Sequence, residues 1–240
     1  MKTLLKKLFP PALTNTLRTI RNNYFDGYSI KSYSQEGEDM ILRRIFEKQQ
    51  SGFYVDVGAH HPFRFSNTFF FYKRGWVGVN IDAMPGSMKP FRKFRPRDIN
   101  IEVPISNSDQ LLTFYAFNEP ALNSFSKELS QERDGKNGYF IQEKIELRAS
   151  RLTSVLDSYL PTGTEIDFLS IDVEGFDLDI LQSNDWVKYK PKIILIEILG
   201  STLSEIEDQA ITIFLKKIGY VVFAKAVNTV IFSRNDIGYS

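Results

Sequence analysis

Carboxylate side chains end several apolar runs of this 240-residue sequence, and a carboxylate can bind hydroxyl groups, hold a cation or accept a proton. Asp172 and Glu197 stand at the ends of two such runs. Glu174 follows closely after Asp172, so both side chains would share a face if the strand continued through them. The carboxyl ends of parallel strands meet at one edge of an open sheet, where ligands bind. We therefore expect these three acids to converge on one site.

Neighbouring carboxylates repel one another unless a proton, a cation or a hydrogen-bond donor intervenes. One solution is a general base with a raised pKa, and Asp172 and Glu197 are candidates for catalysis. A second is a Mg²⁺ ion held by Asp172, Glu174 and Glu197, which would lower the pKa of an acceptor hydroxyl. In a third, Glu174 points away and caps the following helix, and no metal is needed. The sequence leaves these alternatives open.

The segment Phe53–Pro62 is typical of a buried strand that ends in a tight turn beneath a ligand. Gly58 in this turn allows a close backbone approach, and Asp56 precedes it. Asp82 ends the next apolar run, at about the interval where a Rossmann-like fold places a carboxylate on ribose hydroxyls. A strand-end acid can also merely cap a loop. Two such strands with one helix between them nevertheless favour a nucleoside site.

The two histidines of the sequence, His60 and His61, both lie on this turn. The pKa of histidine suits a general base near neutral pH, and we select His61 for that role. In the alternative, one or both histidines only hydrogen-bond the loop.

The amino-acid composition limits the classes of protein to which this chain can belong. The chain has 42% hydrophobic and 25% charged residues and a net charge of +1, which fits one soluble domain with a modest extension. The lack of cysteine excludes a disulfide scaffold and thiolate chemistry. The near-neutral charge argues against a nucleic-acid partner. We expect a cytoplasmic protein, because no apolar run could span a bilayer and no secretory signal opens the chain.

The first part of the chain, residues 1–32, is predicted to be a basic helical extension, and residues 33–240 the main domain. Apolar residues recur near helical spacing on either side of Pro10 and Pro11, which predicts two short amphipathic helices. Either this extension covers the core of its own domain, or it docks on anionic lipid at the inner face of a membrane or on a partner.

Strands and helices alternate through the rest of the sequence, which predicts an α/β fold with a mostly parallel sheet and helices on both faces. Residues 118–139 have weak periodicity and are predicted to form a long loop or lid. Two strands near 220–225 and 229–233 close the chain as a hairpin. A nicotinamide dehydrogenase would ordinarily continue to alternate, whereas a hairpin is expected of a methyltransferase, whose last strand inserts antiparallel.

Several ordered motifs together resemble the FkbM-like family of S-adenosylmethionine-dependent methyltransferases over roughly residues 33–233. The motifs are Ser34-Gln35-Glu36-Gly37-Glu38-Asp39, Asp56-Val57-Gly58-Ala59-His60-His61-Pro62, Ser66-Asn67-Thr68, Gly75-Trp76, Asn80-Ile81-Asp82 and Ile171-Asp172-Val173-Glu174-Gly175. Pro62 departs from the family pattern, in which many relatives have glycine. The resemblance implies a Rossmann-like class I methyltransferase fold with a seven-stranded sheet, and O-methylation of a sugar in a bacterial surface glycan such as a capsule or lipopolysaccharide.

The cofactor implied by the resemblance is S-adenosylmethionine. Asp56 and Gly58 would lie beneath its methionine portion, and Asp82 would bind the ribose hydroxyls. Ser106 follows the third predicted strand, where an adenine would be held. The resemblance also suggests Gln35 and Asn67 for the amino-acid end.

The acceptor implied by the resemblance is a free, nucleotide-linked or polymeric sugar. Two other functions stay open: an oxidoreductase that uses NAD, which fits the terminal hairpin badly, and a non-catalytic nucleoside-binding scaffold of a glycan assembly. A homo-oligomer is also compatible with the sequence.

Overall fold

The computed structural model describes residues 11–25, 27–173, 175–200 and 202–238, and the chain divides into two units, residues 1–32 and 33–240. In the first unit, helix α2 (Pro11–Tyr24) carries Leu13, Leu17 and Ile20 at helical spacing. The other predicted helix of this segment falls on residues 1–10, outside the described residues. None of the described helices combines the length and apolar character needed to cross a membrane.

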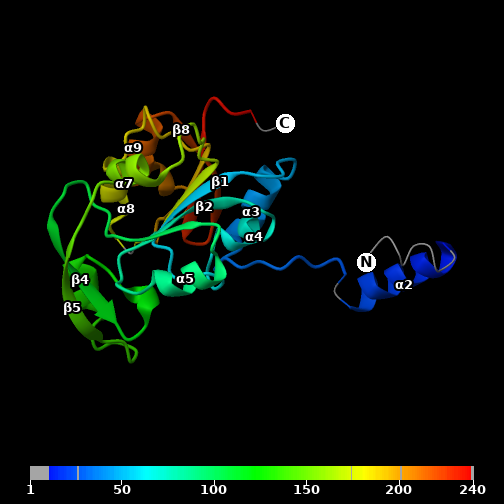
Figure 1. Ribbon diagram of the computed structural model, residues 1–240, viewed down its shortest axis with the longest axis horizontal. Coiled ribbons are helices and arrows are strands. Elements are labelled where there is room, and N and C mark those ends of the chain that lie inside the picture. Colours follow the sequence, from blue (N-terminus) through cyan, green and yellow to red (C-terminus); the bar gives the residue numbers. More distant parts are fainter. Residues whose placement is uncertain (1–10, 26, 174, 201, 239–240) are drawn as a thin grey trace. The chain divides into compact units, whose positions relative to one another are not determined.

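The second unit is built on a seven-stranded sheet with the order β3-β2-β1-β6-β7-β9-β8 (Figure 1). The first five strands in this order pair in parallel, and β9 pairs antiparallel with both β7 and β8. The predicted fold class, with its closing antiparallel hairpin, is confirmed. The strands are β1 (Phe53–Val57), β2 (Val77–Asp82), β3 (Ile99–Glu102), β6 (Phe168–Ile171), β7 (Ile193–Glu197), β8 (Tyr220–Ala226) and β9 (Thr229–Arg234).

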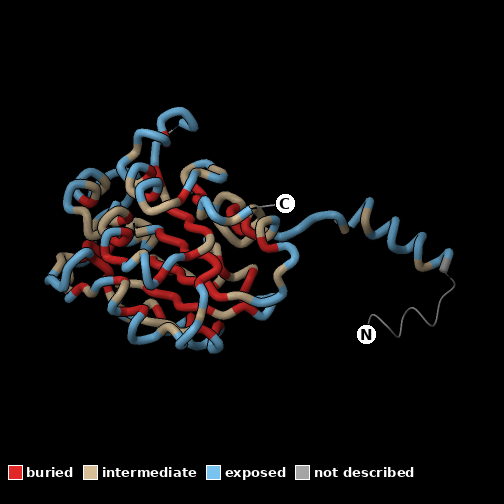
Figure 2. Tube along the Cα trace, turned by 90° about the horizontal axis from the view of Figure 1, so that it is seen from above, coloured by how far each residue is buried: buried red, intermediate tan, exposed pale blue. Residues whose placement is uncertain are grey.

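The central strands are apolar on both faces because helices cover both. Val55 and Leu169 pack in the core formed with α7 (Leu152–Tyr159), α8 (Asp177–Gln182) and α9 (Ala210–Lys217). On the other face, Tyr54 and Phe168 pack against α3 (Glu38–Ile45) and α4 (Phe69–Lys73), and α5 (Met88–Phe94) also belongs to this layer. Figure 2 shows the strands as a buried centre surrounded by exposed turns. Burial on both faces explains why these strands are continuous apolar runs without alternation.

An insertion between β3 and β6 forms a second, two-stranded antiparallel sheet from β4 (Leu111–Phe117) and β5 (Ile141–Arg148). Its connection contains η1 (Pro120–Leu122) and α6 (Lys127–Arg133), so the predicted loop is partly helical. Ser126 caps α6 by accepting a hydrogen bond from the amide of Leu129 at 3.2 Å. The weak periodicity of this segment reflects the short length of both helices.

The two ends of the insertion meet at a neck beside β3. Ile105 and Ser150 form an isolated β-bridge. The amide of Ser106 donates to the carbonyl of Ser150 at 3.0 Å, and the amide of Ser150 donates to the carbonyl of Pro104 at 2.9 Å. The insertion therefore leaves and re-enters the domain at one place.

Candidate active site

A cavity of about 480 Å³ lies at the carboxyl ends of β1, β2, β6 and β7, beneath the insertion. This volume is in the range of small-molecule sites. Of the residues selected from the sequence, those that line it are Gln35, Asp56, Gly58, His61, Asn67, Asp82, Asp172 and Glu197.

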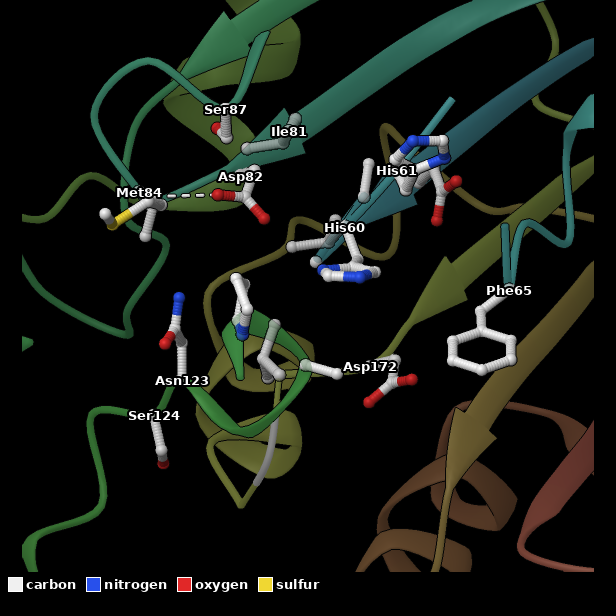
Figure 3. Close-up of a pocket in the computed structure, with 18 of the residues that line it drawn as sticks. His60, His61, Phe65, Ile81, Asp82, Met84, Ser87, Asn123, Ser124 and Asp172 are labelled. Atoms are coloured by element: carbon white, nitrogen blue, oxygen red, sulfur yellow. Dashed lines mark hydrogen bonds between the residues drawn. The ribbon is translucent and has the colours of Figure 1, made fainter. Parts of the chain in front are cut away.

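The cavity has two chemically different ends. Figure 3 shows Asp82, Met84 and Asn123 at one end and Asp172 with Phe65 at the other. His60 lies between the two ends. The apolar part of the lining suits a flat ring such as a purine. Its members include Val103, Ile105, Phe114, Phe125, Phe176 and Ile180.

Gly58 brings three strand ends together. Its φ of +88° lies in the left-handed region, and its amide donates to the carbonyl of Ile81 at 2.9 Å. A Cβ at this position would lie 1.8 Å from the backbone oxygen of Asp172, so only glycine fits. The turn predicted from the sequence is thus a contact between the ends of β1, β2 and β6.

Asp82 is the last residue of β2, and one of its oxygens accepts a hydrogen bond from the amide of Met84 at 2.7 Å (Figure 3). Burial raises the pKa of Asp82 to about 6. A carboxylate that is held by one backbone donor and faces a cavity is suited to accept hydrogen bonds from a diol.

Asn67 presents a buried acceptor to the same cavity. Its Nδ2 donates to the hydroxyl of Ser170 at 3.1 Å. Its Oδ1 is buried and has no hydrogen-bond partner among the described residues. A ligand donor at this position would satisfy that oxygen.

The acidic residues after Gln35 have a structural role that explains their position. Glu36 accepts from the amide of Asn228 at 2.7 Å, and Glu38 accepts from the hydroxyl of Thr229 at 3.0 Å. Both contacts tie the segment before α3 to the β8–β9 turn. Gln35 is therefore held against the cavity, which it lines.

The two histidines have different environments. The Nδ1 atom of His61 accepts from the amides of Phe63 and Arg64 at 3.1 and 3.0 Å, which leaves the proton of the neutral ring on Nε2. His61 therefore holds the loop, and its free nitrogen is a donor. The ring of His60 borders the centre of the cavity (Figure 3). This geometry argues against the predicted role of His61 as general base and favours His60.

Asp172 follows β6 directly, because the strand ends at Ile171. The strand therefore does not continue through Asp172, which was the condition for Asp172 and Glu174 to share a face, and Glu174 itself lies outside the described residues. Glu197 is the last residue of β7. The described part of the chain holds no group of three or more His, Asp or Glu side chains that could bind a metal ion.

Ser106 does not line the cavity, contrary to the predicted contact with an adenine. It is fully buried in the neck of the insertion, where its hydroxyl accepts from Nε2 of Gln110 at 3.0 Å. The neighbouring Ile105 reaches the cavity instead. Ser106 lies away from the cavity because β3 ends at Glu102 and the next residues turn into the neck, and its contact with an adenine stays a prediction.

Phe65 is a site residue that sequence reasoning missed. It lines the cavity, is 41% exposed, and has a φ of +55°, which is uncommon for a bulky side chain. The guanidinium of Arg64 lies 4.2 Å from its ring centre and pairs with Glu119 of the insertion at 3.7 Å. Backbone strain of this kind gathers at functional sites, but no residue pattern signals it.

A comparison with models of protein families identifies the family of this chain. Residues 56–222 match the family model described as the methyltransferase FkbM domain. No curated protein sequence matches the chain.

The solved structures that are similar to the chain include two methyltransferases. A TehB-like SAM-dependent methyltransferase from Corynebacterium glutamicum has 10% identity and a TM-score of 0.43, with 94% of this chain and 100% of that chain covered. A candidate O-methyltransferase from Klebsiella pneumoniae has 12% identity and a TM-score of 0.43, with 97% of this chain and 94% of that chain covered.

Proposed function

This chain belongs to the family of methyltransferases with the FkbM domain, and on that premise we propose that it transfers a methyl group from S-adenosylmethionine to a hydroxyl of a sugar. The sugar would be part of a bacterial surface glycan or of its nucleotide- or lipid-linked precursor. The observation that carries the proposal is a single cavity with a nucleoside-type end at Asp82, an acidic end at Asp172, and a histidine between them. The cytoplasmic location and the peripheral membrane contact of residues 1–32 remain predictions.

The residues of the cavity fit the proposed cofactor. Asp82 would bind the ribose hydroxyls, and the apolar wall beyond it would hold the adenine. The partnerless oxygen of Asn67 would accept from the ammonium group of the methionine portion, with Gln35 close by. Asp56 contributes negative charge at the end of β1. When bound, S-adenosylmethionine supplies a methyl group on a positively charged sulfur that is already a strong electrophile.

The task left to the chain is to orient the acceptor hydroxyl and to remove its proton. Burial, and then the charges of Arg64 and His61, lower the pKa of His60, so its ring is neutral at pH 7 and can accept a proton. We therefore assign the general base to His60. Asp172 and Glu197, which line the same cavity, are assigned to hydrogen bonds with the other hydroxyl groups of the acceptor.

The proposed function is tested first by binding and then by transfer. Isothermal titration should show micromolar binding of S-adenosylmethionine and S-adenosylhomocysteine and none of NAD. A methyl-labelled cofactor is then offered with nucleotide sugars and lipid-linked oligosaccharides, with Mg²⁺ or with EDTA. Label in a sugar is the expected result, and loss of transfer in EDTA would support the predicted metal site. A folded protein that binds neither sulfur nucleoside would contradict the proposal.

Binding of S-adenosylhomocysteine should weaken as the pH falls through about 6, because Asp82 then takes up a proton and loses the charge that strengthens its hydrogen bonds. For a group with this pKa the affinity should fall about tenfold between pH 7 and pH 5. As the pH falls from 7 to 5, the free energy of unfolding of the ligand-free protein should increase because Asp82 takes up a proton. Its pKa is higher in the folded than in the unfolded chain, so protonation favours folding.

The matched control is Asp82→Asn. This variant should bind more weakly at pH 7 and should lose the part of the pH dependence that belongs to Asp82, as measured by titration calorimetry at several pH values. Wild-type affinity and wild-type pH dependence in this variant would exclude Asp82 from the binding site.

A further inference from the structure

A buried arginine lies behind the cavity and connects to it through the hydroxyl groups of Thr68 and Ser66. Arg95, just after α5, is fully buried. Its Nε donates to Asp98 at 2.8 Å, and its Nη2 donates to the hydroxyls of Tyr54 and Thr68 at 2.8 and 2.9 Å. In the sequence Arg95 stands among other basic residues, Arg92, Lys93 and Arg97, yet it lies inside the domain.

The chemistry of the groups fixes the direction of these hydrogen bonds. A guanidinium only donates, so the hydroxyl of Thr68 accepts from Arg95. Its own proton is then available for Asp56, whose Oδ2 lies 3.0 Å away. Arg95, Thr68 and Asp56 thus form a chain of hydrogen bonds that starts in the core and ends at a carboxylate on the cavity wall.

The charges of this network do not cancel. Asp98 has donors of its own, since it accepts from the hydroxyl of Tyr54 at 2.9 Å, the amide of Gly78 at 3.1 Å and Nδ2 of Asn80 at 3.0 Å. One guanidinium therefore faces two carboxylates, Asp98 and Asp56. When both carboxylates are ionised, the network has a net negative charge. Of the two, Asp56 is the one that lines the cavity.

The protonation of Asp56 depends on its neighbours. Burial raises its pKa to about 6, while the charge of Arg95 and the hydrogen bonds from Thr68 and Ser170 lower it. Asp98 opposes ionisation of Asp56, and Asp82 interacts with it across the strand ends. With a pKa of about 6, most of Asp56 is ionised at pH 7, and a small increase in this pKa would leave much of it protonated.

We propose that Arg95 and Thr68 are positioning residues that keep Asp56 ionised and aimed into the cavity, so that its charge attracts a cationic group of the bound cofactor. The inference rests on the proposed function, because it takes the ligand of the cavity to be S-adenosylmethionine. It goes further in assigning a role in binding to residues that do not line the cavity.

The test compares Thr68→Val with Thr212→Val. Both threonines are fully buried, but the hydroxyl of Thr212, on α9, has no hydrogen-bond partner among the described residues. In Thr68→Val the affinity for S-adenosylhomocysteine should fall about twofold at pH 7 and recover at pH 8.5, because the midpoint of its pH dependence moves up by about one pH unit, from about 6 to about 7. Thr212→Val should behave as the wild type. An unchanged midpoint in Thr68→Val would overturn the proposal.

Two further variants separate positioning from a general structural role. On an Asp56→Asn background, Thr68→Val should have no additional effect on affinity, because its effect passes through Asp56. An undiminished effect on that background would overturn the proposal. Arg95→Lys should retain more of the wild-type pH dependence than Arg95→Met, provided that circular dichroism shows both to be folded.

A measurement without ligand distinguishes failure of this inference from failure of the proposed function. In the ligand-free protein, the carboxyl ¹³C resonance of Asp56, assigned by its loss in Asp56→Asn, should titrate at higher pH in Thr68→Val than in the wild type. An unchanged titration overturns the role of Thr68 whatever the cavity binds. Absence of S-adenosylhomocysteine binding in the wild type, with the shifted titration intact, overturns the cofactor assignment alone.

Discussion

Replacing Gly58 with alanine is expected to abolish binding of S-adenosylhomocysteine and to destabilise the fold strongly. The new Cβ would lie 1.8 Å from the backbone oxygen of Asp172 and 2.8 Å from its carbonyl carbon. Both atoms belong to the main chain, so no rotation of a side chain can relieve the overlap, and the ends of β1 and β6 must separate. Because this overlap adds to the cost of a left-handed φ at alanine, we expect the free energy of unfolding to fall by more than about 4 kcal/mol.

Gly75→Ala is the matched control for this prediction. Gly75 has a φ of +97°, and a Cβ there would meet no described atom within 4 Å. This variant should therefore lose only about 1–2 kcal/mol for the left-handed conformation and should bind S-adenosylhomocysteine as the wild type does. Urea unfolding and titration calorimetry measure the two effects. If both variants lost the same stability, the close approach of Gly58 to Asp172 would not matter.

The second large effect is expected at His60. With the acceptor found in the transfer assay, His60→Gln should lower kcat by about 10²- to 10⁴-fold, the usual contribution of a general base. Its affinity for S-adenosylhomocysteine should stay within a few-fold of the wild type. His61→Gln should keep most of its turnover, since a glutamine oxygen can still accept from the amides of Phe63 and Arg64.

The pH profile gives an independent check on the base. Because the pKa of His60 is lowered, its ring stays neutral to a lower pH than that of an ordinary histidine. The acid limb of kcat against pH should therefore fall below about 6.5, the usual histidine pKa, and should disappear in His60→Gln. The opposite ranking of the two variants, with turnover lost only in His61→Gln, would restore the role predicted for His61 from the sequence.

Much of the site could be predicted because the end of an apolar run marks the end of a strand, and the sheet topology then brings these ends together. Gly58 and Asp82 follow clear apolar runs, and a parallel sheet brings such strand ends to one edge. Gln35 and Asn67 lie far from those runs and entered only through the family resemblance, yet both line the cavity. The mostly parallel sheet and its antiparallel last strand followed from the alternation of elements and the terminal hairpin.

What could not be predicted depends on contacts between distant segments or on backbone angles. Burial of Arg95 depends on partners from β1 and from the turn before α4, and neither is encoded in its own basic segment. The left-handed φ of Phe65 has no signature in the residue itself. The roles proposed for His60 and His61 differ because two loop amides donate to one ring nitrogen of His61. The position of Ser106 in the neck could not be predicted, because the neck is formed by a contact with the distant Ser150.

The neck of the insertion has a consequence for how such enzymes diversify. The chain leaves beside β3 and returns to the same place, and the intervening sheet shares no strand with the large one. A segment whose ends already touch can be lengthened, shortened or exchanged without separating the strands that carry Gly58 and Asp82. Evolution can therefore vary the insertion above the cavity, including the lining residues Phe114 and Phe125, while Gly58 and Asp82 at the strand ends are retained. A chimaera that carries only a relative's residues 106–149 would transplant that variation in one step.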